Sequence, residues 1–111
     1  DSQGVAMSGG HYDYKCFEVS QFAEMVDMTI KERSEDREVD HGGYIEQRTA
    51  LPKPLLDKMQ VFVDVMRKCA EMAKDIEWMM SGDTGEEGTD KRLNSALSEV
   101  GKMIQAYHAQ V

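Results

Sequence analysis

Cysteine and long apolar runs are scarce in this chain of 111 residues. Its two cysteines, Cys16 and Cys69, form no CxxC pair, so we expect neither a cysteine-based zinc site nor a disulfide scaffold. No apolar run approaches the ~18 residues of a membrane span. Residues 1–10 lack the basic start and apolar centre of a secretory signal. These absences predict a cytoplasmic protein.

Basic residues are also in short supply. Thirteen lysines and arginines stand against 21 acids, which gives a formal net charge of −8. This charge repels phosphate backbones, so direct binding to nucleic acid is not expected. It suits a basic surface on a partner protein, and it also serves simply to keep a small protein in solution.

Hydrophobic periodicity predicts three helices. The first spans Glu18 to about Glu35, and the second is a helix of about 26 residues after Pro54, which would be roughly 40 Å long. Glycines 82 and 85 end it, and a third helix begins within residues 84–92. The chain is therefore predicted to be all-α, a three-helix antiparallel arrangement with one long central helix. Residues 11–111 form a single helical domain in this prediction, after a flexible extension at 1–10.

Two segments outside the helices invite an assignment. HYDYKCF, residues 11–17, is predicted to be extended and to lie against the body of the protein. The polar linker 34–53 is long for a compact domain, so a short element within it, such as YIEQRTAL, is conceivable.

The end of the long helix is apolar on more than one face, around Trp78. Either the N-terminal segment or another subunit, in a possible homo-oligomer, covers that surface.

No pattern for catalysis or for a resident cofactor stands out. His11 with Asp13, and Asp40 with His41, are pairs without a spacing that fixes a coordination geometry. The loop SGDTGEEG, residues 81–88, is too short for a calcium hand and lacks the lysine of a phosphate-binding loop. We therefore expect neither an enzyme nor a metal or cofactor site.

Two stretches resemble a family of small, uncharacterised phage and prophage proteins. MSGGHYDY (7–14) is similar to the opening motif of that family, and DIEWMMSGDTGEE (75–87) to its late motif. The residues that match are Ser8, Gly9, Gly10, His11, Tyr12, Asp13 and Tyr14 in the first motif, and Trp78, Ser81, Gly82, Asp83, Gly85, Glu86 and Glu87 in the second. The resemblance implies a phage accessory protein in the host cell cytoplasm, with residues 1–6 preceding the family start. It implies no reaction.

The two motifs are predicted to meet at one pole of the helical hairpin. There the glycines would allow close approach of backbones, and the aromatic rings offer flat apolar faces with polar tips. This arrangement describes either a structural clasp or a binding site. The candidate binding residues are His11, Tyr12, Asp13, Tyr14, Trp78, Ser81, Asp83, Glu86 and Glu87.

Three functions follow as hypotheses. The first is a binding protein that inhibits or modulates a host defence protein, as an anti-CRISPR does, by placing acids on a basic nucleic-acid-binding surface. Its candidate acidic surface is Glu35, Asp36 and Glu38. The second is a sponge that traps a signalling nucleotide between Trp78 and Tyr12 or Tyr14. The third is a metal-dependent enzyme that uses His11, Asp13 and Asp83.

Overall fold

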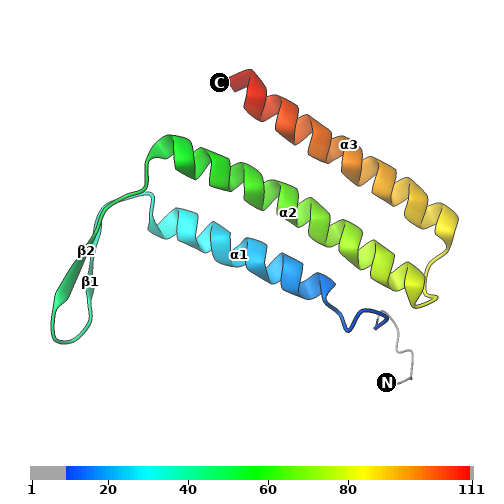
Figure 1. Ribbon diagram of the computed structural model, residues 1–111, viewed down its shortest axis with the longest axis horizontal. Coiled ribbons are helices and arrows are strands. Elements are labelled where there is room, and N and C mark those ends of the chain that lie inside the picture. The colour runs from blue at the N-terminus through cyan, green and yellow to red at the C-terminus, as the bar shows by residue number, and fades with distance from the viewer. Residues whose placement is uncertain (1–9, 111) are drawn as a thin grey trace.

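Three long helices dominate the computed structural model, which describes residues 10–110. They are α1 (Cys16–Glu32), α2 (Lys53–Met80) and α3 (Glu86–Gln110). Neighbouring helices run antiparallel, and α2 lies between the other two (Figure 1). α2 contacts both neighbours, whereas the described parts of α1 and α3 do not contact each other. The predicted three-helix arrangement with a long central helix is confirmed.

A β-hairpin makes the protein not strictly all-α, which corrects the predicted fold class. β1 (Arg37–Asp40) pairs antiparallel with β2 (Ile45–Arg48), with Arg37 opposite Arg48. Gly42 has φ +83°, a conformation that glycine adopts without a steric penalty, and its N–H donates to the Asp40 carboxylate at 2.8 Å. The linker therefore does contain an element, and it projects from one end of the helices (Figure 1).

The N-terminal segment is not extended as predicted. Residues 11–15 form consecutive turns, and α1 begins at Cys16, two residues before the expected start. Asp13 and Tyr14 have φ values of 56° and 58°, in the left-handed region that such residues seldom adopt. The prediction failed because the contacts that hold these turns come from α2, about 65 residues away in the sequence.

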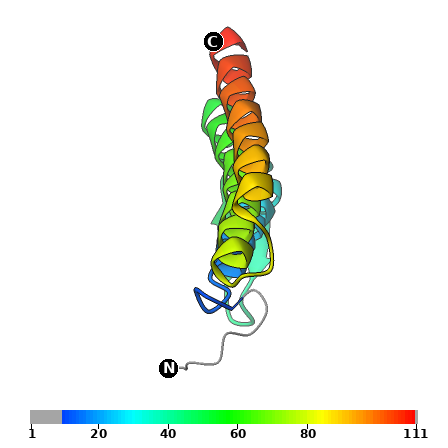
Figure 2. The same cartoon turned by 90° about the vertical axis from the view of Figure 1, so that its right-hand side faces the viewer.

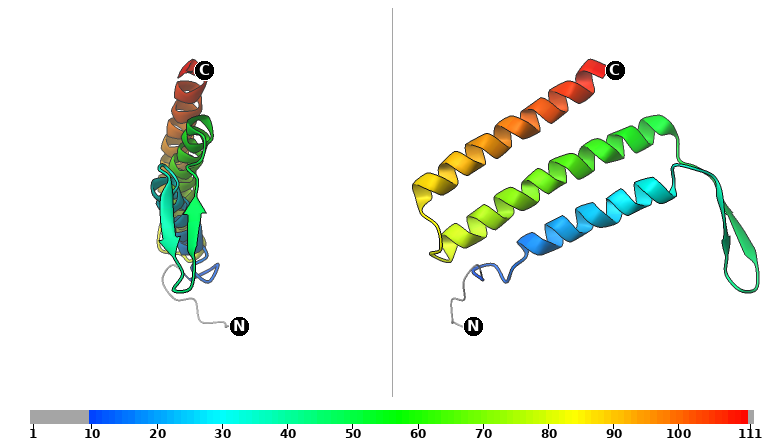
Figure 3. Two further views of the ribbon diagram at one scale, coloured as in Figure 1. Left: turned by 90° about the vertical axis from the view of Figure 1, so that its left-hand side faces the viewer. Right: turned by 180° about the vertical axis from the view of Figure 1, so that it is seen from behind.

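The helices form a single layer. Edge-on views show α1, α2 and α3 overlapping in one layer (Figures 2 and 3). The Cα atoms span 53 × 41 × 13 Å. Because a domain usually needs two packed layers to enclose a core, little is enclosed here. Among the described residues, the buried hydrophobic side chains are Cys16, Ala23, Val63 and Ala96.

Candidate functional site

The candidate binding residues gather at the end of the layer where α2 passes into α3. We call residues 10–15, which fold over the last turns of α2, the N-terminal clasp. The N–H of His11 donates to the Ser81 hydroxyl at 2.9 Å. The structure thus brings together the two motifs, as the shared-pole prediction required (Figure 1).

Glu77 holds the clasp in place. Its Oε2 accepts the N–H of Tyr14 at 2.6 Å and that of Tyr12 at 3.1 Å. The Glu77 side chain is only 1% exposed, and its Oε1 has no hydrogen-bond partner among the described residues. A left-handed φ at Asp13 and Tyr14 costs about 1–2 kcal/mol at each residue, which the charged hydrogen bonds offset.

The protonation of Glu77 reflects these contacts. Burial on its own raises the pKa of the carboxyl. The N–H of Tyr14, the thiol of Cys16 and the N–H of Tyr12 outweigh this effect and hold the pKa of Glu77 below its ordinary value. The pKa of the Cys16 thiol is raised, first by burial and then by the Glu77 carboxylate. Cys16 is therefore a protonated thiol in the core and not an activated nucleophile.

Sequence reasoning missed Glu77. Its position continues the apolar stripe Val63, Met66, Ala70 and Ala73 at steps of three and four residues, on the side of α2 that faces α1. An acid on such a stripe must be neutralised or hydrogen-bonded when it is buried. An acid within an apolar stripe is therefore the feature of the sequence from which hydrogen bonds to Glu77 from a distant part of the chain could have been predicted.

An aromatic cluster covers Trp78 on another side of the clasp. The rings of Tyr14 and Phe17 approach Trp78 edge-on, with centroid distances of 6.2 and 6.1 Å. The ammonium of Lys74 lies 5.5 Å from the centre of the Trp78 ring. Side chains of the protein itself therefore occupy the surroundings of Trp78, which leaves less room for a stacked nucleobase than the sponge hypothesis requires.

Tyr12 lines a pocket to which Trp78 does not contribute. The pocket has a volume of 320 Å³ and is also lined by Cys16, Val19, Ile76 and Glu77, among others. The tyrosines at 12 and 14 are thus separated, with Tyr12 beside this mainly apolar pocket and Tyr14 in the aromatic cluster. A ligand sandwiched by Trp78 and Tyr12 is not supported by this placement.

The acids of the two motifs remain at the surface of the pole. Asp13 lies in the clasp, and Asp83 lies in the loop, where its N–H donates to the Trp78 carbonyl at 2.9 Å. Glu86 and Glu87 form the first turn of α3, where negative charge complements the helix dipole. Both line a broad, shallow hollow of 610 Å³ beside Met79. We call Asp13, Asp83, Glu86 and Glu87 the acidic pole.

The other predicted acids lie at the opposite end, by the hairpin. Asp36 accepts the N–H of Ala50 at 2.7 Å, and Glu38 accepts the side-chain amide of Gln47 at 2.9 Å. Glu35 is exposed. Two of these three acids therefore have structural roles in closing the hairpin, and the three do not join the acidic pole (Figure 1).

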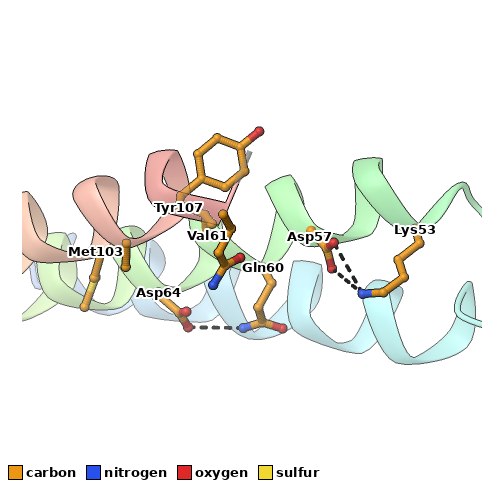
Figure 4. A pocket seen from close by; sticks show the side chains of 9 residues that line it. Lys53, Asp57, Gln60, Val61, Asp64, Met103 and Tyr107 are labelled. Atoms are coloured by element: carbon orange, nitrogen blue, oxygen red, sulfur yellow. Dashed lines mark hydrogen bonds and ion pairs between the residues drawn. The ribbon is translucent and has the colours of Figure 1, made fainter.

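Neither His41 in the hairpin nor the groove at the N-terminal end of α2 brings together the described side chains of a catalytic site. The Nε2 atom of His41 lies 2.7 Å from Glu46, and its ring stacks on Tyr44. The groove, 390 Å³ in volume, lies between α2 and the end of α3. In it the Tyr107 hydroxyl points away from the Asp64 carboxylate, and Lys53 pairs with Asp57 (Figure 4). Within residues 10–110, no three His, Cys, Asp or Glu side chains are grouped so that they could hold a metal ion.

Comparisons with known proteins add no family. No family model, curated protein or solved structure matches this chain. The resemblance to phage proteins therefore stays a prediction. Ser8 and Gly9 of its first motif lie outside the described residues, as does the extension predicted at 1–10 except for Gly10. Over the described part of the chain, no helix is both long and apolar enough to cross a membrane.

Proposed function

We propose that this protein is a non-enzymatic binding protein that occupies a basic surface of a partner protein with its acidic pole. The observation that carries the proposal is the pole itself. Segments about 70 residues apart in sequence place the carboxylates of Asp13, Asp83, Glu86 and Glu87 at one end of the layer. Clustered charge of one sign steers a complementary surface into contact and selects against acidic ones.

The clasp gives this surface a fixed shape. Hydrogen bonds from His11, Tyr12 and Tyr14 to α2 hold the turn in one conformation before any partner arrives. A pre-organised surface loses less conformational entropy on binding than a mobile one. The exposed rings of Tyr12 and Tyr14 also supply the apolar contact area that such interfaces use.

Local charge balance favours the pole over the hairpin acids. Glu35, Asp36 and Glu38 are interleaved with Arg33 and Arg37, so the field at the base of the hairpin is mixed. The pole also has three bases, and each has its own contact: Lys91 pairs with Glu87 at 3.6 Å, Lys15 pairs with Glu18 at 3.0 Å, and Lys74 lies 5.5 Å from the centre of the Trp78 ring. The resemblance to phage proteins suggests the finer proposal: the partner is a host defence protein with a nucleic-acid-binding surface, inhibited as an anti-CRISPR would inhibit it.

A matched pair of variants tests this function. Glu86→Lys with Glu87→Lys reverses two charges at the pole, and Glu32→Lys with Glu35→Lys makes the same change of net charge at the hairpin end. Each is used to capture proteins from a bacterial host lysate at several salt concentrations. We expect the wild type and the hairpin-end variant to retain the same basic protein, which the pole variant loses and which salt releases. Capture that is insensitive to the pole variant would overturn the proposal.

A further inference from the structure

The single layer of helices leaves two broad faces open, and the two differ in chemistry. α2 meets α1 and α3 along its two flanks, so the arcs between those flanks face outward on either side of the layer (Figures 2 and 3). At about 100° per residue, side chains three and four positions apart share an arc. The residues of each arc can therefore be read from the α2 sequence.

One face is polar and carries the ion pairs between helices. On α2 its arc contains Gln60, Asp64, Arg67, Glu71 and Lys74, and it ends at Trp78, against which Tyr14 and Phe17 pack. Arg67 pairs with Glu24 of α1, Lys68 with Glu99 of α3 at 3.0 Å, and Arg92 of α3 with Asp75 at 3.0 Å. This face can remain in contact with water.

The other face is apolar. Its arc on α2 steps alternately by three and four residues, and only one of its eight positions is charged: Leu55, Lys58, Phe62, Val65, Cys69, Met72, Ile76 and Met79. We call these residues the α2 seam. A strict three-four alternation over this length is the pattern of a helix that packs along another helix. Since α1 and α3 lie on the flanks, neither runs along the seam.

The flanking helices extend the apolar face on both sides of the seam. Phe22 of α1 packs edge-on against Phe62 at 6.0 Å, and Leu97 and Ile104 of α3 share an arc on the same side as Leu93. Phe22 is 51% exposed, Leu97 57% and Ile104 43%. Single apolar residues scattered over a protein surface are normal, but here exposed apolar side chains lie side by side on three adjoining helices. They form a continuous apolar patch.

The size of the molecule also shows that something is uncovered. The radius of gyration is 18.8 Å, whereas a compact chain of this length has about 13 Å. The accessible surface is 7767 Å², against about 6,200 Å² for a folded monomer of 12.6 kDa. The projecting hairpin and both faces of the layer (Figures 1 and 2) share this excess of about 1,500 Å², which is larger than the ~800 Å² that each partner buries in a standard stable interface.

We infer that the apolar face is covered by a second copy of this chain, with the two layers face to face and the α2 seams packed together. A two-fold dimer supplies the second layer that the core lacks, and it supplies for each seam a helix with the same three-four repeat. The ion-paired faces of both copies then point outward, whereas Glu86 and Asp90, which share a hollow with Met79 and Leu93, lie at the edge of the interface.

Two double variants, each of which adds two negative charges per chain, test the dimer. Leu55→Glu with Leu97→Glu places two acids on exposed positions of the apolar face. Gln60→Glu with Ser95→Glu places two acids in other arcs of the same two helices, and the wild type and both double variants are compared for helix content. We expect the wild type and the second variant to sediment at twice the chain mass at about 100 µM, where an interface of this size is occupied. The apolar-face variant should dissociate at about a hundredfold higher concentration, the effect of about 1.4 kcal/mol from each of the two substitutions, counted over both copies.

The wild-type mass keeps the test decisive even if the apolar-face variant fails to fold. A wild type that sediments as a monomer of 12.6 kDa at about 100 µM would overturn the inference, and so would a dimer that the apolar-face acids leave intact. The seam adjoins the acidic pole at Met79, which lines one hollow with Glu86 and Glu87. The two tests stay distinguishable because the dimer test changes Leu55 and Leu97, which do not line that hollow.

Discussion

Glu77→Gln should release the N-terminal clasp while the helices stay folded. A hydrogen bond to a charged group contributes about 1.5–3 kcal/mol and one to a neutral group about 0.5–1.5 kcal/mol. The N–H groups of Tyr12 and Tyr14 would therefore each lose about 1 kcal/mol. The new amide N–H₂ would also replace Oε1, which has no partner among the described residues, at a further cost of about 1 kcal/mol. The expected total is about 3 kcal/mol.

Chemical denaturation at fixed protein concentration, together with hydrogen exchange of the Tyr12 and Tyr14 amides, measures this effect. Glu71→Gln is the control, because Glu71 lies on the same helix but is exposed, and its change should stay within about 0.5 kcal/mol. The reasoning about the clasp is refuted if both variants lose equal stability and the two amides exchange as slowly as in the wild type.

Lowering the pH should abolish the difference in stability between the wild type and Glu77→Gln. The pKa of Glu77 is lower in the folded protein than its ordinary value of 4.5, so the unfolded chain takes up the proton first. The stabilisation is fully present above about pH 4.5 and is lost as the pH falls through the folded-state pKa. The gap in stability between the wild type and Glu77→Gln should shrink across that window, and a gap that widens in acid would contradict the assignment.

Four further substitutions probe the fold. Val63→Ala removes two methyl groups from a fully buried site and should cost about 1–2 kcal/mol in denaturation; no measurable loss would argue against the α1–α2 contact. Gly82→Ala at φ +86° should cost about 1 kcal/mol, whereas Gly85→Ala, which has no left-handed φ and no obstructing neighbour, should cost less, through the poorer N-cap that alanine gives α3. Gly42→Ala should raise the amide exchange rate of Val39 in the hairpin while helix content measured by circular dichroism stays constant, and a helix loss would show that the hairpin supports the layer.

The elements that the sequence predicted correctly are those with strong local patterns. The repeat of apolar residues after Pro54 indicated a helix of about 26 residues, and α2 has 28. Gly82, in the left-handed region directly after Ser81, marks the end of that helix as expected. These features depend on neighbours within a few residues, so a single sequence is enough to reveal them.

The elements that were missed depend on contacts across the chain. Strands of four residues, REVD and IEQR, are too short and too polar to stand out from a linker, and only their pairing makes them a hairpin. The turns at Asp13 and Tyr14 require the Glu77 carboxylate, which is distant in sequence. Of the candidate site, the meeting of the two motifs at one pole was predicted correctly, whereas the separation of Tyr12 from Trp78 depends on side-chain packing.

The single layer was also invisible in the sequence. Apolar stripes on three helices are compatible with a closed bundle, in which each helix touches the other two. Here the wide apolar surface of α2 accommodates a neighbour on each flank and leaves the seam of Phe62, Val65 and Cys69 between them. The sequence did indicate that α2 had more than one surface to cover, but not which segment would cover it.

Small-angle X-ray scattering of the wild-type protein over a concentration series tests the central claim most directly, namely that this chain is one layer of a two-layer molecule. The forward intensity should give twice the chain mass of 12.6 kDa, and the pair-distance distribution should show two stacked layers. A particle of 12.6 kDa at every concentration, with a radius of gyration near 18.8 Å, would contradict it.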